Sequence, residues 1–186
     1  MTQKMSLKNG VCDEHKFVIS ACGFTFQGYC SILNKYGIHA SQIHFNGDEA
    51  SQQDVENILK NQDAHIVVFL GKGVVNLLES LKRLASVLNA LPVIRHVTLY
   101  GDIPDGWLYR TLGSLLNNSY QLSLIRVASV SDVVGCFNTH YKSFKDRSRV
   151  LRERYMDIGS EENLKWLTRR EIDVLLNFYR GMSVKE

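Results

Sequence analysis

The residues best suited to chemistry are scattered along the chain. The six histidines are spread from His15 to His140, and the four cysteines include no pair at C-x-x-C spacing, so neither zinc nor a Cys–His nucleophile is indicated. Gly71-Lys72-Gly73 is too short for a phosphate-binding loop, and the sequence contains no nucleophile elbow or carboxylate pair. We therefore expect a protein that is not an enzyme and that needs no metal or cofactor.

Strand and helix patterns alternate through most of the chain. Apolar, β-branched runs predict strands at Phe17–Cys22, Ser41–Phe45, His65–Leu70, Arg95–Tyr100 and Tyr120–Val127. Helical spacing predicts helices at Thr25–Tyr36, Asp48–Asn61, Val74–Leu91 and Trp107–Leu116, and a last one capped by Ser131. Such an alternation predicts an α/β fold, a flavodoxin-like (CheY-like) doubly wound five-stranded parallel sheet with strand order 2-1-3-4-5.

The C-terminal segment has a different pattern. Asp157–Glu162 is a polar break that suits a linker. Thr168 and Glu171 then form a T-x-x-E capping box before an apolar stripe, and Gly181 stands where a left-handed helix cap is needed. Ser183 and Glu186 make a second capping box, so a new helix is predicted to begin as the sequence ends. Helix, glycine turn and helix are the start of an all-α helix-turn-helix.

This segment resembles the DNA-binding domain of LuxR/FixJ (NarL-like) transcription regulators, whose signature is close to L-T-x-R-E-x-x-V-L-x-x-x-x-x-G-x-S-x-K-E-I-A. Matches stand at Leu167, Thr168, Arg170, Glu171, Val174, Leu175, Gly181, Ser183, Lys185 and Glu186. The resemblance implies a flexible N-terminus at 1–14, a receiver-like domain at 15–145, a linker helix and loop at 146–165, and an incomplete helix-turn-helix domain at 166–186.

The receiver-like part departs from the family at its phosphorylation pocket. A receiver needs adjacent acidic residues after its first strand to hold magnesium, and a phosphate-accepting aspartate at the end of its third. The first site contains Ser20, Ala21 and Cys22, and the second is Leu70. The family's switch position falls near Thr98 or Leu99, and its lysine is replaced by Arg126. We expect a pseudo-receiver that cannot be phosphorylated.

Two further features bear on ligands. Trp166-Leu167-Thr168-Arg169 matches the W-[FLM]-[TS]-R motif with which some family members bind cyclic di-GMP, but it overlaps the helix-turn-helix signature. The basic excess lies in the C-terminal part, where Lys142–Glu186 holds 11 basic and 8 acidic residues, against 11 of each in Met1–Tyr141. An excess of this kind favours contact with phosphate or an acidic partner.

The preferred interpretation is a cytoplasmic DNA-binding transcription regulator, controlled by dimerisation or by pairing with a second response regulator. The resemblance assigns DNA binding to Thr168, Arg170, Ser183 and Lys185, although Ser183 and Lys185 serve equally well as a cap and a solvated side chain. The interface candidates are Tyr141 and Phe144, unless they fold back onto the linker helix. Two alternatives are a receiver-like interaction module that does not bind DNA and a small-ligand sensor using the crevice at the strand ends.

Overall fold

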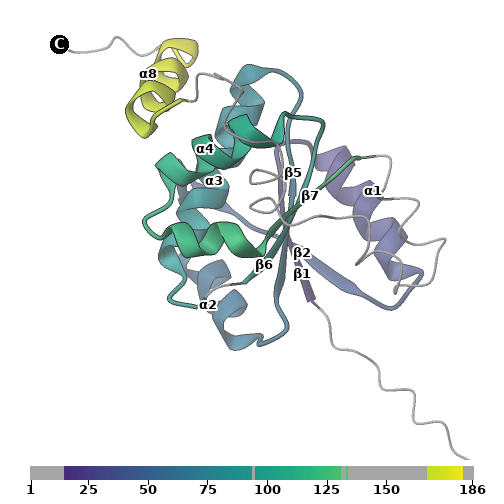
Figure 1. Ribbon diagram of the computed structural model, residues 1–186. Helices are drawn as coiled ribbons and strands as arrows, with labels where there is room; N and C mark the ends of the chain where they lie inside the picture. Colours follow the sequence, from purple (N-terminus) through teal and green to yellow (C-terminus); the bar gives the residue numbers. More distant parts are fainter. Residues whose placement is uncertain (1–14, 94, 131–132, 134–166, 182–186) are drawn as a thin grey trace, which may run out of the picture.

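In the computed structural model of the chain, the described residues are 15–93, 95–130, 133 and 167–181. They form a five-stranded parallel sheet with the order β2-β1-β5-β6-β7 (Figure 1). The strands are β1 (His15–Ser20), β2 (His39–Gln42), β5 (His65–Phe69), β6 (His96–Tyr100) and β7 (Ile125–Ala128). Counted within the sheet, this is the order 2-1-3-4-5, so the predicted flavodoxin-like arrangement of the strands is confirmed.

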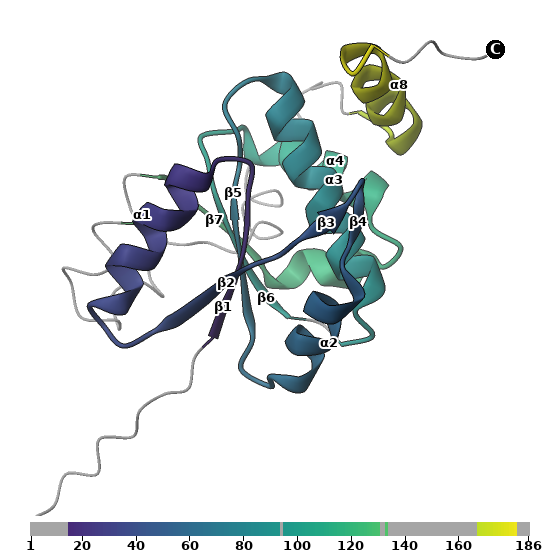
Figure 2. The same ribbon diagram turned by 180° about the vertical axis from the view of Figure 1, so that it is seen from behind.

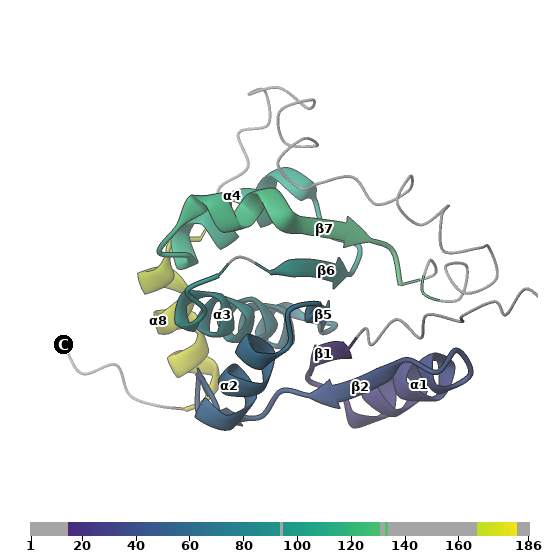
Figure 3. The ribbon, with the colours of Figure 1, turned by 90° about the horizontal axis from the view of Figure 1, so that it is seen from below.

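Helices lie on both faces of the sheet (Figure 3). The described helices are α1 (Gly23–Asn34), α2 (Gln52–Lys60), α3 (Val74–Ala90), α4 (Asp105–Leu115) and α8 (Arg169–Tyr179). On one face α1 packs on a small cluster containing Tyr29, Leu33 and Val67. On the other face α2, α3 and α4 cover the larger core. Because the central strands are buried on both faces, β5 is apolar throughout after His65.

The start of the second predicted helix is corrected by local turn chemistry. The helix expected from Asp48 begins only at Gln52, because residues before it form a hairpin of β3 (Phe45–Asn46) and β4 (Glu49–Ala50). Gly47 supplies the positive φ of 64° for that turn. Ser51 then caps α2 by accepting a hydrogen bond from the backbone N–H of Asp54.

The last strand of the sheet is also shorter than predicted. Residues Ser119–Leu124 form a 3-10 helix, η1, in front of β7. The side chain of Asn118 caps η1 by accepting from the backbone N–H of Tyr120. Within η1 the Leu122 side chain points into the core and is 2% exposed. Its burial gave the run Tyr120–Val127 an apolar residue of the kind that a strand also buries. The expected helix after Ser131 lies outside the described residues, apart from Val133.

The helix α8 packs on the receiver-like part at the side covered by α3 and α4, as both ribbon views show (Figures 1 and 2). Its capping box is confirmed: the Thr168 hydroxyl accepts from the backbone N–H of Glu171, whose carboxylate accepts from the backbone N–H of Thr168. Gly181 follows with a φ of 72°, as its predicted role as a left-handed cap requires. No helix in the described ranges is long and apolar enough to cross a membrane.

Candidate functional site: the carboxyl edge of the sheet and the docked helix α8

The carboxyl edge of the sheet brings together the first group of predicted site residues. Ser20 ends β1 and lies in register with Phe69, which pairs in turn with Tyr100 on β6. Ala21, Cys22 and Leu70 follow directly after the ends of β1 and β5. The Ser20 hydroxyl donates to the carbonyl of Cys22 at 3.0 Å and accepts from its backbone N–H at 3.2 Å. It closes the turn into α1.

Aromatic side chains fill this edge on the α1 side. Phe69 and Tyr100 stack with ring centroids 5.2 Å apart, and Tyr29 meets Phe69 edge-on at 5.1 Å. All three are buried, with exposures between 4% and 7%. Because an apolar surrounding penalises charge, this side of the edge is poorly suited to hold a phosphoryl group or a hydrated cation.

Two carboxylates follow a different strand from those at which the resemblance to receivers places acidic residues. Asp102 and Asp105 follow β6, whereas receivers carry their acidic residues after the first and third strands of the sheet. Asp102 is exposed, and Asp105 is the first residue of α4 and is 9% exposed. Among the described residues, no group of three or more His, Cys, Asp or Glu side chains is placed to hold a metal ion.

Thr98 and Arg126 do not join the edge. They pair with each other in the β6–β7 register two residues before Tyr100 and Ala128. Thr98 is 1% exposed and contacts His65, which begins β5. The structure therefore separates Thr98 and Arg126 from Ser20, Ala21, Cys22 and Leu70.

A partly buried polar chain crosses β1, β5 and β6 at positions before their carboxyl ends. Lys16 is 6% exposed, and its ammonium donates to Nδ1 of His65 at 3.0 Å. An ammonium can only donate, so the ring proton lies on Nε2, which donates to the Thr98 hydroxyl at 2.8 Å. Sequence spacing gave no sign of this chain, because its members stand on three separate strands.

Cys22 is the one predicted edge residue with a perturbed acidity. It is exposed at the N-cap of α1. The Cys22 side chain makes no capping hydrogen bond, but the backbone and side-chain donors of Thr25 and the backbone donor of Phe24 lie near its thiol and lower its pKa. Donors at a helix N-terminus stabilise the thiolate in this way.

The start of helix α8 holds the two residues expected from the resemblance to bind DNA that lie within the described part of the chain. Thr168 and Arg170 are both exposed. The Thr168 hydroxyl caps the helix by accepting from the backbone N–H of Glu171, and it also donates to the Glu171 carboxylate at 2.7 Å. Hydrogen bonds from the backbone N–H and hydroxyl of Thr168 lower the pKa of Glu171. Ser183, Lys185, Tyr141 and Phe144 lie outside the described residues.

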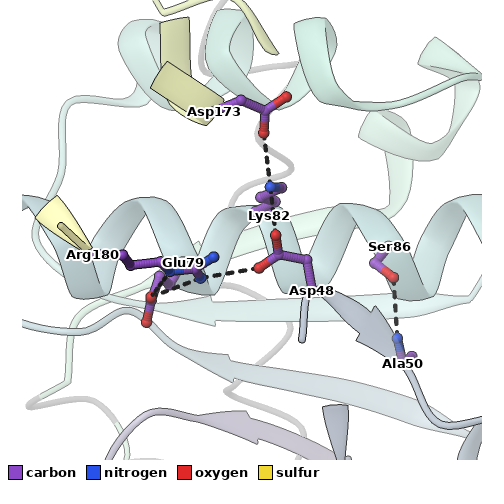
Figure 4. Close-up of polar contacts among 7 residues, drawn as sticks. All are labelled: Asp48, Ala50, Glu79, Lys82, Ser86, Asp173 and Arg180. Carbon is purple, nitrogen blue, oxygen red and sulfur yellow. Dashed lines mark hydrogen bonds and ion pairs between the residues drawn. The ribbon is translucent and has the colours of Figure 1, made fainter. Parts of the chain in front are cut away.

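A charged network fastens α8 to the receiver-like part (Figure 4). Lys82 of α3 lies between Asp48 of the hairpin and Asp173 of α8, with nitrogen–oxygen distances of 2.6 and 2.7 Å. Arg180 reaches Asp48 at 3.0 Å and Glu79 at 2.9 Å. Asp48 therefore binds two cations from two different helices.

The network shifts the acidity of its members. Partial burial acts to raise the pKa of Asp48, but hydrogen bonds from Arg180 and Lys82 together hold it below its ordinary value. Burial acts to lower the pKa of Lys82, while Asp173 and Asp48 raise it above its ordinary value. Both shifts favour the charged forms, so Asp48 and Lys82 are both charged at neutral pH.

A cavity of about 510 Å³ lies beside this network. It is bordered by the hairpin, α3, the end of α4 and the first turns of α8, and its lining includes Glu49, Ser86, Asn89, Asn117, Arg169 and Asp173. Asn89 is already engaged, because it donates to the Leu115 carbonyl and accepts from the backbone N–H of Asn117. The mixed charges of the lining favour no single class of ligand.

Comparison with known proteins adds no assignment. A scan against protein-family models, a search of curated proteins and a search of solved structures each returned no match.

Proposed function

We propose that this protein is a DNA-binding transcription regulator of the LuxR/FixJ type, whose receiver-like domain works by association and not by aspartyl phosphorylation. The observation that carries the proposal is α8. It begins at the capping box of Thr168 and Glu171 and is followed by the left-handed Gly181, at the places where the signature requires a helix to start and to turn. This agreement of local geometry with a DNA-binding signature supports the helix-turn-helix assignment.

The carboxyl edge supports the second half of the proposal. Ser20, Ala21, Cys22 and Leu70 supply no carboxylate where a receiver holds its metal and accepts phosphate. The stacked Phe69 and Tyr100 occupy the α1 side of the same edge. Association then remains as the means of control, because two DNA half-sites at fixed spacing are bound better by a dimer.

In this proposal the partners are DNA, bound through the complete helix-turn-helix domain, and either a second copy or a second response regulator, and the protein works in the cytoplasm. Arg170 is exposed on α8 and is available to a phosphate. Ser183 and Lys185 are proposed for further phosphate contacts, and Tyr141 and Phe144 for the protein–protein interface.

The direct test is selection of DNA by the purified protein with a complete helix-turn-helix domain, because base contacts come from the recognition helix, which segment 166–186 does not include. Sheared genomic DNA is incubated with the immobilised protein at physiological salt, washed and sequenced, because non-specific phosphate binding is weak under these conditions. Enrichment of discrete sites sharing a sequence element is the expected result. Uniform recovery of all fragments, or none, would contradict the proposal. Enrichment only after a second regulator is added would instead favour the interaction module that does not bind DNA itself.

A further inference from the structure

The helix α8 has two apolar faces. On the inner face Ile172 and Leu176 are 0% and 1% exposed and belong to the same core cluster as α3 and α4. On the opposite face Val174 and Phe178 are exposed by 44% and 72%, whereas Tyr179, two turns after Ile172 on the inner side, ends the helix and is exposed by 57%. Because Ile172 and Leu176 are four residues apart, they lie one turn above the other on the helix. The inner stripe is therefore part of the receiver-like core.

The buried positions differ from those that the DNA-binding signature specifies. Ile172 and Leu176 fall on positions that the signature leaves open, whereas Val174 is a signature position and stays exposed. Leu175, the other apolar signature position within the helix, packs only at the edge of the core. Docking of α8 thus uses residues additional to those that mark it as a DNA-binding helix.

Polar contacts hold α8 at its start, middle and end. Just before it, the carbonyl of Leu167 accepts a hydrogen bond from the Ser114 hydroxyl of α4 at 2.9 Å. In its middle, Asp173 pairs with Lys82. At its end, Arg180 donates to Glu79 through Nε at 3.3 Å and through Nη2 at 2.9 Å, which gives the pairing a direction as well as a charge (Figure 4).

These contacts restrict the motions open to the helix. An apolar stripe alone would permit sliding or rotation, since hydrophobic attraction has no direction. Three polar attachments along the axis oppose sliding, tilting and rotation together. Exposed ion pairs each contribute little, but Lys82 and Asp48 have side chains only 21% and 31% exposed, and they share partners within one network.

We propose that the α3–α4 face with the β3–β4 hairpin is a receptor surface for α8 of the same chain, and that it fixes the DNA-binding segment rigidly to the receiver-like domain. Ile172 and Leu176 provide the buried contact, and the network of Asp48, Glu79, Lys82, Asp173 and Arg180 sets the orientation. The meaning of the docking for DNA binding rests on the proposed function, but the docking itself does not. The receiver-like domain and α8 then move as one body, so association of the former positions the latter directly.

The test is hydrogen exchange of the whole chain, monitored by mass spectrometry. In the wild type, amides of α8 are expected to be protected, as those of α3 are. Leu176→Ala is expected to speed exchange in α8 by about tenfold or more, because it removes a fully buried contact, while β5 remains protected. The matched control is Phe178→Ala, which truncates an exposed side chain on the same helix and should leave α8 exchange within about twofold.

The charges are tested separately. Arg180→Glu places a carboxylate beside Asp48 and Glu79 and should also speed α8 exchange, and adding Glu79→Arg should recover at least half of the lost protection. Unprotected α8 amides in the wild type, equal effects of Leu176→Ala and Phe178→Ala, or no recovery in the charge-swapped double variant would overturn the proposal. Protected α8 in a protein that selects no DNA would uphold the docking and reject the proposed regulator function instead.

Discussion

Ser20 stands where a receiver of the resembled family presents a carboxylate, and its hydroxyl is committed to the backbone of Cys22. The neighbouring Phe69 and Tyr100 make the α1 side of this edge apolar. Single side chains therefore decide what the carboxyl edge is able to bind, although the sheet around it has the same strand order as that of a receiver.

The first prediction concerns phosphorylation. Incubation of the purified protein with acetyl phosphate and magnesium is expected to leave its intact mass unchanged, because Ser20, Ala21, Cys22 and Leu70 offer no acceptor carboxylate. Intact-mass spectrometry measures the outcome, with an active receiver as the positive control. A stoichiometric adduct labile to hydroxylamine, on Asp102, Asp105 or any other aspartate, would show that the edge is chemically competent after all.

The second prediction concerns the thiols. The donors of Thr25 near the exposed Cys22 lower the pKa of its thiol, whereas burial raises the pKa of Cys30 in the helix that follows. Since the thiolate is the reactive form, iodoacetamide at neutral pH should modify Cys22 about tenfold or more faster than Cys30 in the folded protein. Peptide mapping gives both rates in one sample, and urea-unfolded protein is the control in which the rates converge. Similar rates in the folded protein would contradict the assignment of these two environments.

At the scale of elements, turn chemistry accounts for the late start of α2 relative to the prediction. Gly47 and Ser51 produce a hairpin and a later helix start where helical spacing alone predicted one helix from Asp48. This hairpin has a consequence for α8, because it brings Asp48 to Lys82 and Arg180. An irregular connection thereby becomes part of the surface that receives the C-terminal helix.

The third prediction follows from the acidity of Asp48. Its pKa in the folded protein is held below the ordinary 3.8, so its ion pairs stabilise the fold above that pH, and the contribution is lost as the pH falls through the lowered value. Lys82 has a raised pKa, and its contribution is present below its ordinary 10.5 and is lost as the pH rises through the raised value. Between these limits both groups are charged.

Asp48→Asn should therefore lower the free energy of unfolding by about 0.5–2 kcal/mol at neutral pH, a range that allows for the partial exposure of the pairs. The difference from the wild type should shrink towards zero only as the pH falls below the lowered pKa of Asp48, where the wild-type carboxylate is also protonated. Urea unfolding at a series of pH values measures both effects, and Asp63→Asn, at an exposed carboxylate, is the control. A difference that stays constant down to the lowest pH would show that Asp48 acts through shape and not through charge.

At the scale of the whole molecule, one core joins elements that are distant in the sequence. Ile172 and Leu176 of α8 belong to the same cluster as Leu81 of α3 and Leu112 of α4. If the receiver-like domain associates, a helix anchored in this core is carried with it.

The fourth prediction concerns that association. The wild-type chain is expected to dimerise or to pair with a second response regulator, and Tyr141→Ala combined with Phe144→Ala should shift it towards monomer. The reason is that large aromatic side chains at an interface centre contribute up to about 2 kcal/mol or more each. Sedimentation velocity over a concentration series measures the shift, and circular dichroism shows whether the variant keeps its fold. A wild type that stays monomeric at high concentration and pairs with no related regulator would exclude this mechanism.

Local patterns in the sequence were enough to predict the strand order of the sheet, the helices on both of its faces and the capping box of α8. Each depends on residues close together in the chain: the apolar runs of the strands, the spacing of the helices, and Thr168 with Glu171. The loss of carboxylates at Ser20 and Leu70 was equally visible, because it is a matter of residue type.

Only the tertiary structure decided which distant side chains meet. It placed Lys16, His65 and Thr98 in one partly buried chain, and it separated Thr98 and Arg126 from the carboxyl edge. It also brought Asp48 and Arg180 together across 132 positions of sequence. The physical reason is that an amphipathic pattern shows that a helix must bury one face, but not against which surface. For α8 that choice was made by the shape and charge of α3, α4 and the hairpin.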